Sequence, residues 1–423
     1  MPSSFLKTIT LVFLILLSVM YPLNPGATAA ENPVKIRVLM PAPDAAEWKP
    51  FLERFHAGQK RIHLEIEEGP TSPDTLEDIY TTSFLLGNSP YDLVLMDVVW
   101  TGKFAASGWL QPVDNLINSG ELKEFLDGDV EAGRYEGRLY RIPLRSDAGL
   151  LYYRQDLLET SGYSAPDTFT QLLEISRSLQ KEGKVQWGYL WQGKQYEGLS
   201  AMFVEILEGF GGFWVKSDTL EVGLDQPQAI SAVKFLQGTL REGISPPGVT
   251  SYAEEDTRRI FESGKAAFIR NWPYMFGLAN LPDSAVKGKF NIKPMVHAPS
   301  YSSGACLGGW GLGIAKSTAH PQESWEVIQY LTSESVQRDF ILATSKLPSR
   351  KALYNDPLIV AQYPHYPRLL QIAQNSALRP AIAQYAQVSS ILQRYLSSAL
   401  TGRLSPEIAM AKAARETRQL LRR

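Results

Sequence analysis

Cysteine is almost absent from this chain of 423 residues. The single residue, Cys306, excludes an internal disulfide bond, so a protein of this size must be stabilised by its apolar core. Histidine is also sparse. The five histidines are scattered and include no pair at i,i+4 spacing, so we expect neither a zinc site nor another metal or cofactor.

Sequence motifs of catalysis and nucleotide binding are missing as well. No Gly-x-Ser-x-Gly is present, and no Gly-Lys pair precedes the Ser or Thr that a phosphate-binding loop requires. The net charge is -2 and no basic run is long, which argues against a nucleic-acid partner. These absences favour a binding protein over an enzyme.

The N-terminus carries the features of a signal peptide. Lys7 precedes an apolar run over residues 9–20, and small residues follow up to Ala30. The apolar run is too short to cross a membrane comfortably. We therefore predict export, with a signal peptide over residues 1–30 that is cleaved after Ala29 or Ala30. No cysteine lies directly after that site, so we expect no lipid anchor at the new N-terminus.

The first part of the mature chain alternates between strand and helix patterns. Residues 34–40 and 62–66 alternate as strands do, helical patterns cover 44–58 and 74–86, and 91–100 is an apolar run. This order predicts an α/β fold with a parallel sheet. Asp44 and Glu47 are spaced as a capping box, so we expect Asp44 to cap the first helix.

Two carboxylates adjoin apolar strand residues. Asp97 ends the third predicted strand, and Asp147 lies where two extended runs, within 139–154, meet. A buried carboxylate is costly unless a partner binds it, and ligands of α/β sheets bind beyond the strand ends. We interpret both as ligand contacts. The alternatives are a structural cap at Asp97 and a turn-forming Asp147.

Large rings follow two further predicted strands. Residues 266–269 read as a strand that ends before Trp272 and Tyr274, and residues 307–315 form a glycine-rich strand around Trp310. Rings at strand ends can offer a face to a ligand, although they can equally fill the core. Helical patterns cover 168–181, 199–208, 321–343 and 390–420.

Five motifs in order give the chain a family resemblance. They are Leu95-Met96-Asp97-Val98-Val99-Trp100, Asp147-Ala148-Gly149-Leu150-Leu151-Tyr152-Tyr153-Arg154, Trp191-Gln192-Gly193-Lys194-Gln195-Tyr196-Glu197-Gly198, Arg270-Asn271-Trp272-Pro273-Tyr274 and Leu307-Gly308-Gly309-Trp310. Over essentially the whole mature chain, the sequence resembles the trehalose/maltose-binding proteins of ABC importers, within the family 1 extracellular solute-binding proteins.

The resemblance implies a two-lobed type II periplasmic-binding-protein fold with a ligand cleft between the lobes. It implies lobe 1 over 31–143 and 297–335, lobe 2 over 144–296 and 336–423, and a hinge near residues 143–147. The ligand-binding residues that it implies are Asp44, Thr71, Asp97, Arg145, Asp147, Trp272, Tyr274, Gly309 (by backbone), Trp310 and Arg379.

The ligand class also follows from the resemblance. Arg145 stands where related trehalose/maltose binders carry Tyr, so the sugar is expected within the trehalose, sucrose, maltose or glucosylglycerol class, or smaller than a disaccharide. The partners implied are the sugar and ABC permease subunits of the inner membrane, and the protein is expected to be a periplasmic monomer. The alternatives are a secreted hydrolase that uses Asp97 and Asp147, and a receptor that presents its sugar to a sensor.

Overall fold

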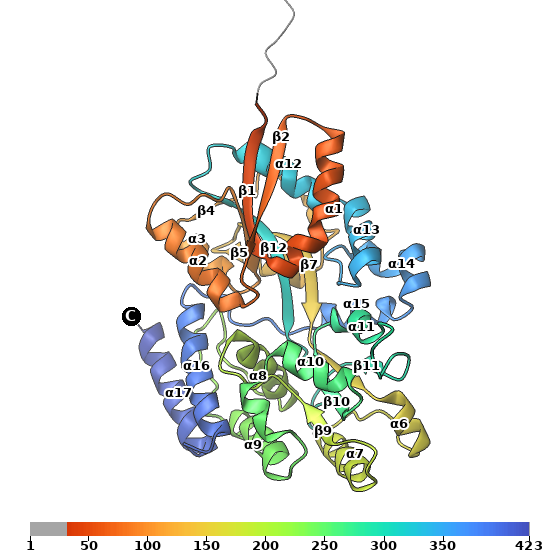
Figure 1. The fold of residues 1–423 in the computed structure, drawn as a ribbon. Coiled ribbons are helices and arrows are strands. Elements are labelled where there is room, and N and C mark those ends of the chain that lie inside the picture. Colours follow the sequence, from red (N-terminus) through yellow and green to blue (C-terminus); the bar gives the residue numbers. More distant parts are fainter. Residues whose placement is uncertain (1–31, 423) are drawn as a thin grey trace, which may run out of the picture.

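Two β-sheets form the framework of the computed structural model, which describes residues 32–422. The larger sheet lies in the upper half of Figure 1 and the smaller sheet in the lower half. The predicted signal peptide and its cleavage site lie outside the described residues. No helix among residues 32–422 is both long and apolar enough to cross a membrane.

The large sheet contains the first three predicted strands. Its order is β2-β1-β3-β12-β4, and β7 pairs with β12. The strands β1, β2 and β3 are parallel, as their alternation with helices predicts, whereas β12 runs antiparallel to β3. Their bounds are β1 Val34–Pro41, β2 Ile62–Gly69, β3 Leu93–Asp97, β4 Leu110–Gln111, β7 Ile142–Ala148 and β12 Leu307–Ala315.

The small sheet has the order β11-β8-β10-β9. Every residue of β10 is buried, as are those of β3 and β12, which fits central strands covered on both faces. A separate hairpin pairs β5 with β6. The bounds are β5 Arg134–Tyr135, β6 Arg138–Leu139, β8 Leu150–Tyr153, β9 Trp187–Leu190, β10 Ala266–Asn271 and β11 Asn291–Lys293.

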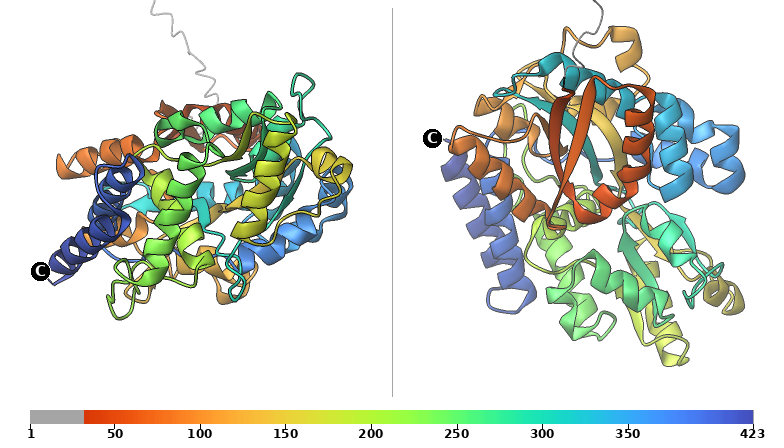
Figure 2. Two further views of the ribbon diagram at one scale, coloured as in Figure 1. Left: turned by 90° about the horizontal axis from the view of Figure 1, so that it is seen from below. Right: turned by 45° about the horizontal axis from the view of Figure 1, so that its top comes forward.

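Helices surround both sheets (Figure 2). They are α1 Ala42–Gly58, α2 Pro73–Leu85, α3 Thr101–Ala106, α4 Ser119–Leu122, α5 Asp127–Glu131, α6 Gln155–Thr160, α7 Phe169–Lys181, α8 Glu197–Gly209, α9 Pro227–Arg241, α10 Glu254–Glu262, α11 Met275–Ala279, α12 Pro321–Leu331, α13 Glu334–Thr344, α14 Pro357–Gln362, α15 Tyr366–Gln374, α16 Tyr385–Leu400 and α17 Pro406–Leu421. Short 3-10 helices cover Pro247–Ser251 and Lys351–Asn355.

Three details of the helices differ from the sequence predictions. The pattern over 321–343 is two helices, α12 and α13, and that over 390–420 is an antiparallel pair, α16 and α17. Asp44 is not a cap: α1 begins directly after Pro41, with Pro43 and Asp44 both inside its first turn. By contrast, α7 begins at the expected place, where Thr168 and Gln171 form a capping box.

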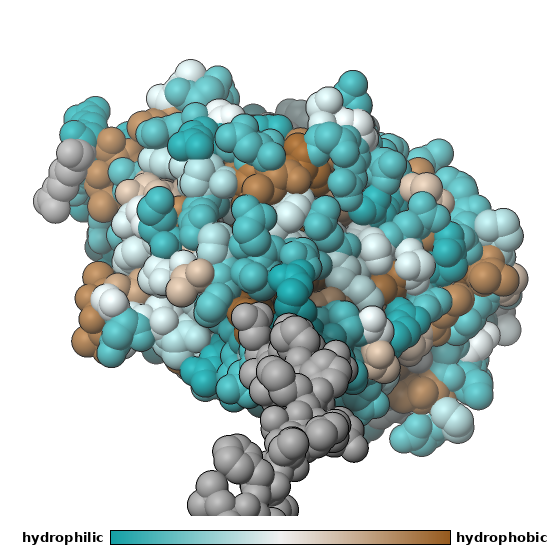
Figure 3. Space-filling model, turned by 90° about the horizontal axis from the view of Figure 1, so that it is seen from above, coloured by the Kyte–Doolittle hydropathy of each residue, from teal (hydrophilic) through white to brown (hydrophobic). Residues whose placement is uncertain are grey.

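The chain passes between the two sheets at Gly149. The strand β7 pairs with β12 as far as Ala148, and β8 begins at Leu150 in the small sheet. This pairing places the change of sheet after the predicted hinge segment 143–147. The lobe bounds at 143/144, 296/297 and 335/336 remain a prediction. On the face seen from above, apolar side chains are scattered among hydrophilic ones (Figure 3).

Candidate ligand-binding site

Strand pairing brings three of the predicted residues side by side. Within β12, Trp310 pairs with Asp97 of β3 on one side and with Arg145 of β7 on the other. Two positions before Trp310 in the same strand, Gly308 pairs with Asp147 of β7. The register of one glycine-rich strand therefore collects residues from three distant parts of the sequence at one end of the large sheet.

The glycine before Trp310 is required by the backbone. Gly309 has φ +124°, and a Cβ there would lie 2.6 Å from the carbonyl oxygen of Arg145. Its own carbonyl oxygen accepts a hydrogen bond of 3.1 Å from the N–H of Val98. This oxygen is thus engaged within the sheet, and the expected backbone contact of Gly309 with a ligand stays a prediction.

Arg145 joins two of the predicted carboxylates. Its guanidinium donates to Oδ2 of Asp147 at 3.0 Å and to Oδ2 of Asp44 at 3.2 Å. The ammonium of Lys346 donates to Asp44 and to Glu47. Burial alone would raise the pKa of Asp44, but these two cations outweigh it and lower that pKa below its ordinary value.

Asp147 has one carboxylate oxygen free for a further donor. Its side chain is 6 % exposed, and its Oδ1 has no hydrogen-bond partner among the described residues. Burial raises the pKa of Asp147 to about 6 although Arg145 opposes the shift. A buried acceptor of this kind is costly unless a donor such as a ligand hydroxyl reaches it. Asp147 lies within β7, so it is not the turn-forming residue of the alternative interpretation.

A third cation, Arg379, links Asp97 to Glu197 of α8. Arg379 is 5 % exposed and donates to Oδ1 of Asp97 at 3.1 Å and to Glu197, at the start of α8, at 2.5 Å. Asp97 Oδ1 also accepts from the N–H of Val99 at 3.2 Å, so it acts as a turn cap as well. The Nε of Arg379 is buried and without a hydrogen-bond partner within residues 32–422.

Glu197 is the most densely bonded carboxylate of the site. Besides Arg379, the hydroxyls of Tyr385 and Ser389 donate to it. Burial raises the pKa of Glu197 to about 7 against the influence of these donors. Sequence reasoning missed it, as it missed Lys346: Glu197 starts an apolar helix, and no local pattern marks Lys346.

The two predicted tryptophans differ in their surroundings. Trp310 is 8 % exposed, with the Trp100 ring edge-on at 5.4 Å and Arg145 Cζ 5.7 Å from its ring centroid. Trp272 is half-buried, and its Nε1 donates to Glu254 at 3.1 Å. A Cβ on Gly308 would lie 2.9 Å from the Trp272 ring and 3.1 Å from Cβ of Asp147, so that ring adjoins the carboxylate cluster.

Two predicted residues lie at the margin of this cluster. Tyr274 is half-buried and donates to Glu255 at 2.9 Å, beside Trp272 and the start of α10. Thr71 is exposed in the turn between β2 and α2. The structure thus groups eight of the ten predicted residues closely: Asp44, Asp97, Arg145, Asp147, Trp272, Gly309, Trp310 and Arg379.

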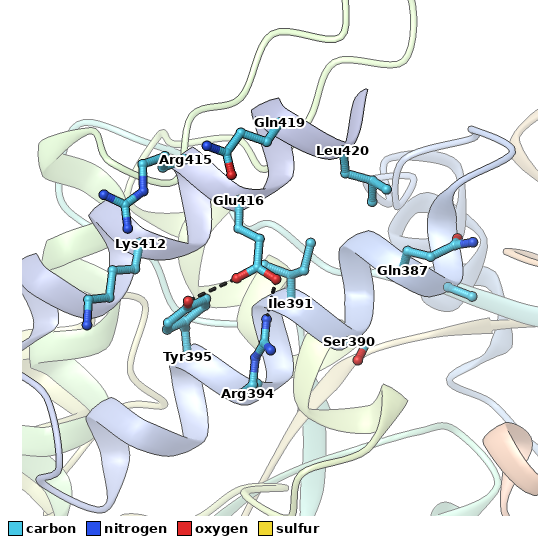
Figure 4. A pocket seen from close by; sticks show the side chains of 11 residues that line it. Gln387, Ser390, Ile391, Arg394, Tyr395, Lys412, Arg415, Glu416, Gln419 and Leu420 are labelled. Atoms are coloured by element: carbon cyan, nitrogen blue, oxygen red, sulfur yellow. Dashed lines mark hydrogen bonds and ion pairs between the residues drawn. The ribbon is translucent and has the colours of Figure 1, made fainter. Parts of the chain in front are cut away.

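A groove of about 690 Å³ lies elsewhere, between α16 and α17. Figure 4 shows Arg394 and Tyr395 both directed at Glu416, to which they bond. None of the ten predicted residues lines it. Across residues 32–422, no group of three His, Cys, Asp or Glu side chains is placed to hold a metal ion.

The model of the bacterial extracellular solute-binding protein family matches residues 40–338. The chain belongs to this family. A probable ABC transporter-binding protein of Deinococcus radiodurans is 30% identical over 355 residues, which cover 82% of this solute-binding protein and 84% of the relative. A maltotriose-binding protein of Pyrococcus abyssi is 26% identical over 320 residues, covering 73% and 64% of the two chains.

Solved structures agree with this assignment. Maltose-bound T. maritima MalE3 is 37% identical, with a TM-score of 0.86 over 92% of this chain and 100% of that one. A solute-binding protein of Agrobacterium radiobacter K84 in complex with ribitol has a TM-score of 0.83 at 23% identity, covering 92% and 98%. This solute-binding protein therefore has the α/β fold of type II periplasmic sugar-binding proteins. As a member of its family, it is an extracellular solute-binding protein.

Proposed function

We propose that this protein captures a glycoside or disaccharide of the trehalose, sucrose, maltose or glucosylglycerol class in the periplasm and delivers it to the permease as a monomer. The observation that carries the proposal is the buried, unpartnered Oδ1 of Asp147 beside the Trp272 ring, within the described part of the chain. An acceptor next to a flat apolar surface matches a pyranose, which has a C–H face and a rim of hydroxyl donors.

The other residues of the cluster fit the same ligand. Asp97 offers a carboxylate held by Arg379, whose unpartnered Nε, judged over residues 32–422, can donate to a sugar oxygen. A ligand that lacks the matching hydroxyls would leave these buried groups unpaired, which is the basis of discrimination at such sites. We assign the ligand-binding role to the ten predicted residues and add Glu197 and Lys346 as their partners.

The relatives support the sugar class without fixing one member. T. maritima MalE3, at 37% identity, was solved with maltose bound, and the Pyrococcus abyssi relative is a maltotriose-binding protein. Arg145 occupies the two carboxylates Asp44 and Asp147, which leaves fewer free acceptors for a second sugar unit. That arrangement favours a ligand smaller than maltotriose.

Titration calorimetry with trehalose, sucrose, maltose and glucosylglycerol tests the proposal. We expect at least one to bind with a Kd in the micromolar range, about -8 kcal/mol, which suits capture and release. The matched control is Asp147→Asn, which keeps the shape of the side chain and halves its acceptors. Failure of all four glycosides to bind below millimolar concentration would refute the ligand class.

Two further measurements test the hydrolase alternative and the predicted export. Prolonged incubation with the same sugars, followed by product analysis, tests the hydrolase: any turnover that Asp97→Asn abolishes would favour an enzyme. N-terminal sequencing of the exported protein tests cleavage after Ala29 or Ala30, and an intact Met1 would refute it.

A further inference from the structure

Two segments that connect the two sheets lie beside the segment that connects α15 with α16. Gly149 donates its N–H to the carbonyl of Cys306 at 3.2 Å, Ala377 donates to Ala305 at 2.7 Å, and Leu307 donates to Ala377 at 2.8 Å. We call these segments, residues 148–150, 305–307 and 376–378, the crossover segments. A rotation of one sheet against the other must change the backbone here, because hinges absorb their motion at a few connecting residues.

A fully buried ion pair lies directly against the crossover segments. Glu205 of α8 and Arg270 of β10 are both 0 % exposed, and Nε of Arg270 donates to Glu205 Oε2 at 2.7 Å while Nη2 donates to Oε1. The same Oε1 accepts from the N–H of Cys306 at 3.4 Å. A Cβ on Gly149 would lie only 1.7 Å from it, so the carboxylate occupies the space that glycine leaves.

The opposite side of this ion pair supports Trp272. The guanidinium carbon of Arg270 lies 3.9 Å from the centroid of the Trp272 ring, a cation–π contact inside the protein. Gln192 fixes the guanidinium from another side, accepting from Nη1 at 3.4 Å and donating to the Arg270 carbonyl at 3.0 Å. One face of the ring is thus occupied, which leaves the other for a ligand.

We propose that the Glu205–Arg270 pair holds Trp272 in its sugar-binding orientation and couples that ring to the crossover segments, so that ligand contact at Trp272 biases the rotation of the sheets. Arg270 and Glu205 are positioning residues, since neither is exposed to a ligand. Buried ion pairs add little stability compared with apolar residues, so a role in specifying one arrangement accounts better for this pair. The inference rests on the proposed function only for the identity of the ligand.

The experiment compares Arg270→Lys with Arg154→Lys as a matched control. Arg154 is also buried and directly follows β8, the strand that pairs with β10. Its guanidinium forms a bidentate ion pair with Asp156 and not with Glu205. The lysine keeps the charge and loses the planar stack. Proteins labelled with 5-fluorotryptophan report the ring directly by fluorine NMR without ligand, with the Trp272 resonance assigned from Trp272→Phe.

We expect Arg270→Lys to move the Trp272 resonance and Arg154→Lys to leave it in place. With whichever of the four glycosides binds the wild type most tightly, Arg270→Lys should weaken binding about tenfold. In a Trp272→Ala background the same change should have less than about a twofold effect, since the residue acts through the ring.

An unmoved Trp272 resonance, or an equal loss of affinity in both backgrounds, would overturn the proposal. If no glycoside binds the wild type, the proposed function fails, and the resonance alone decides whether the pair positions the ring. Should Arg270→Lys fail to fold by circular dichroism, the double variant Glu205→Leu/Arg270→Met takes its place. It removes both charges and retains their volume.

Discussion

Replacing Gly149 by alanine should destabilise the protein strongly. The new Cβ would lie 1.7 Å from Oε1 of Glu205, 2.4 Å from its Cδ and 2.8 Å from Nη2 of Arg270. Because both side chains are fully buried and bonded to each other, the carboxylate can move away only by giving up part of its bonding to Arg270. Overpacking costs about 1–3 kcal/mol and a weakened charged hydrogen bond about 1.5–3 kcal/mol, so we expect a loss of about 2.5–6 kcal/mol in total.

Urea unfolding followed by circular dichroism measures this change. The matched control is Gly238→Ala in α9, where no atom of the described residues lies within 4 Å of the added Cβ. Helix propensity predicts that this control gains about 0.5–1 kcal/mol. A second variant, Glu205→Asp, withdraws the carboxylate by one methylene and should partly rescue Gly149→Ala. Stability of Gly149→Ala within about 0.5 kcal/mol of the wild type would refute the placement of the carboxylate.

Three further predictions concern the site and its buried acids. Trp272→Ala or Trp310→Ala should weaken sugar binding by about 1.5–3 kcal/mol in calorimetry with the fold intact by circular dichroism; if both variants unfold, the rings belong to the core. Arg145→Gln removes a cation that opposes the effect of burial, so the pKa of Asp147 should rise above about 6 in a carbon-13 NMR titration. Burial raises the pKa of Asp129 to about 7 from an ordinary 3.8, so the unfolded chain releases this proton at lower pH than the folded protein. Stability should therefore fall as pH rises from about 4 to 7, by up to about 4 kcal/mol from this group, and Asp129→Asn should flatten that slope in urea unfolding.

The sequence predicted the parts of the fold that local patterns encode. Alternation over 34–40 and 62–66 marked β1 and β2, and the buried carboxylate at the end of an apolar run marked Asp97. Pro43, which starts helices well, was the overlooked sign that α1 begins before Asp44. The break between α12 and α13 was missed because Thr332 and Ser333 are weak helix breakers inside a continuous apolar pattern.

The charge partners of the site could not be predicted, because they depend on contacts between distant residues. Lys346 is 302 positions from Asp44, and Arg379 is 182 positions from Glu197. A local motif shows that a carboxylate will be buried next to a strand but not which cation will reach it. The family resemblance supplied Arg379, whereas Lys346 and Glu197 required the folded chain.

The balance of charge in the site favours a neutral ligand. Three cations are engaged there, and each is bonded to two carboxylates: Arg145 to Asp44 and Asp147, Lys346 to Asp44 and Glu47, Arg379 to Asp97 and Glu197. Five carboxylates thus share three cations, so an anionic ligand would have to take a cation from a buried acid and leave that acid unpaired. A sugar hydroxyl instead donates to the carboxylate oxygens that remain free, and it can bind without breaking any of these ion pairs.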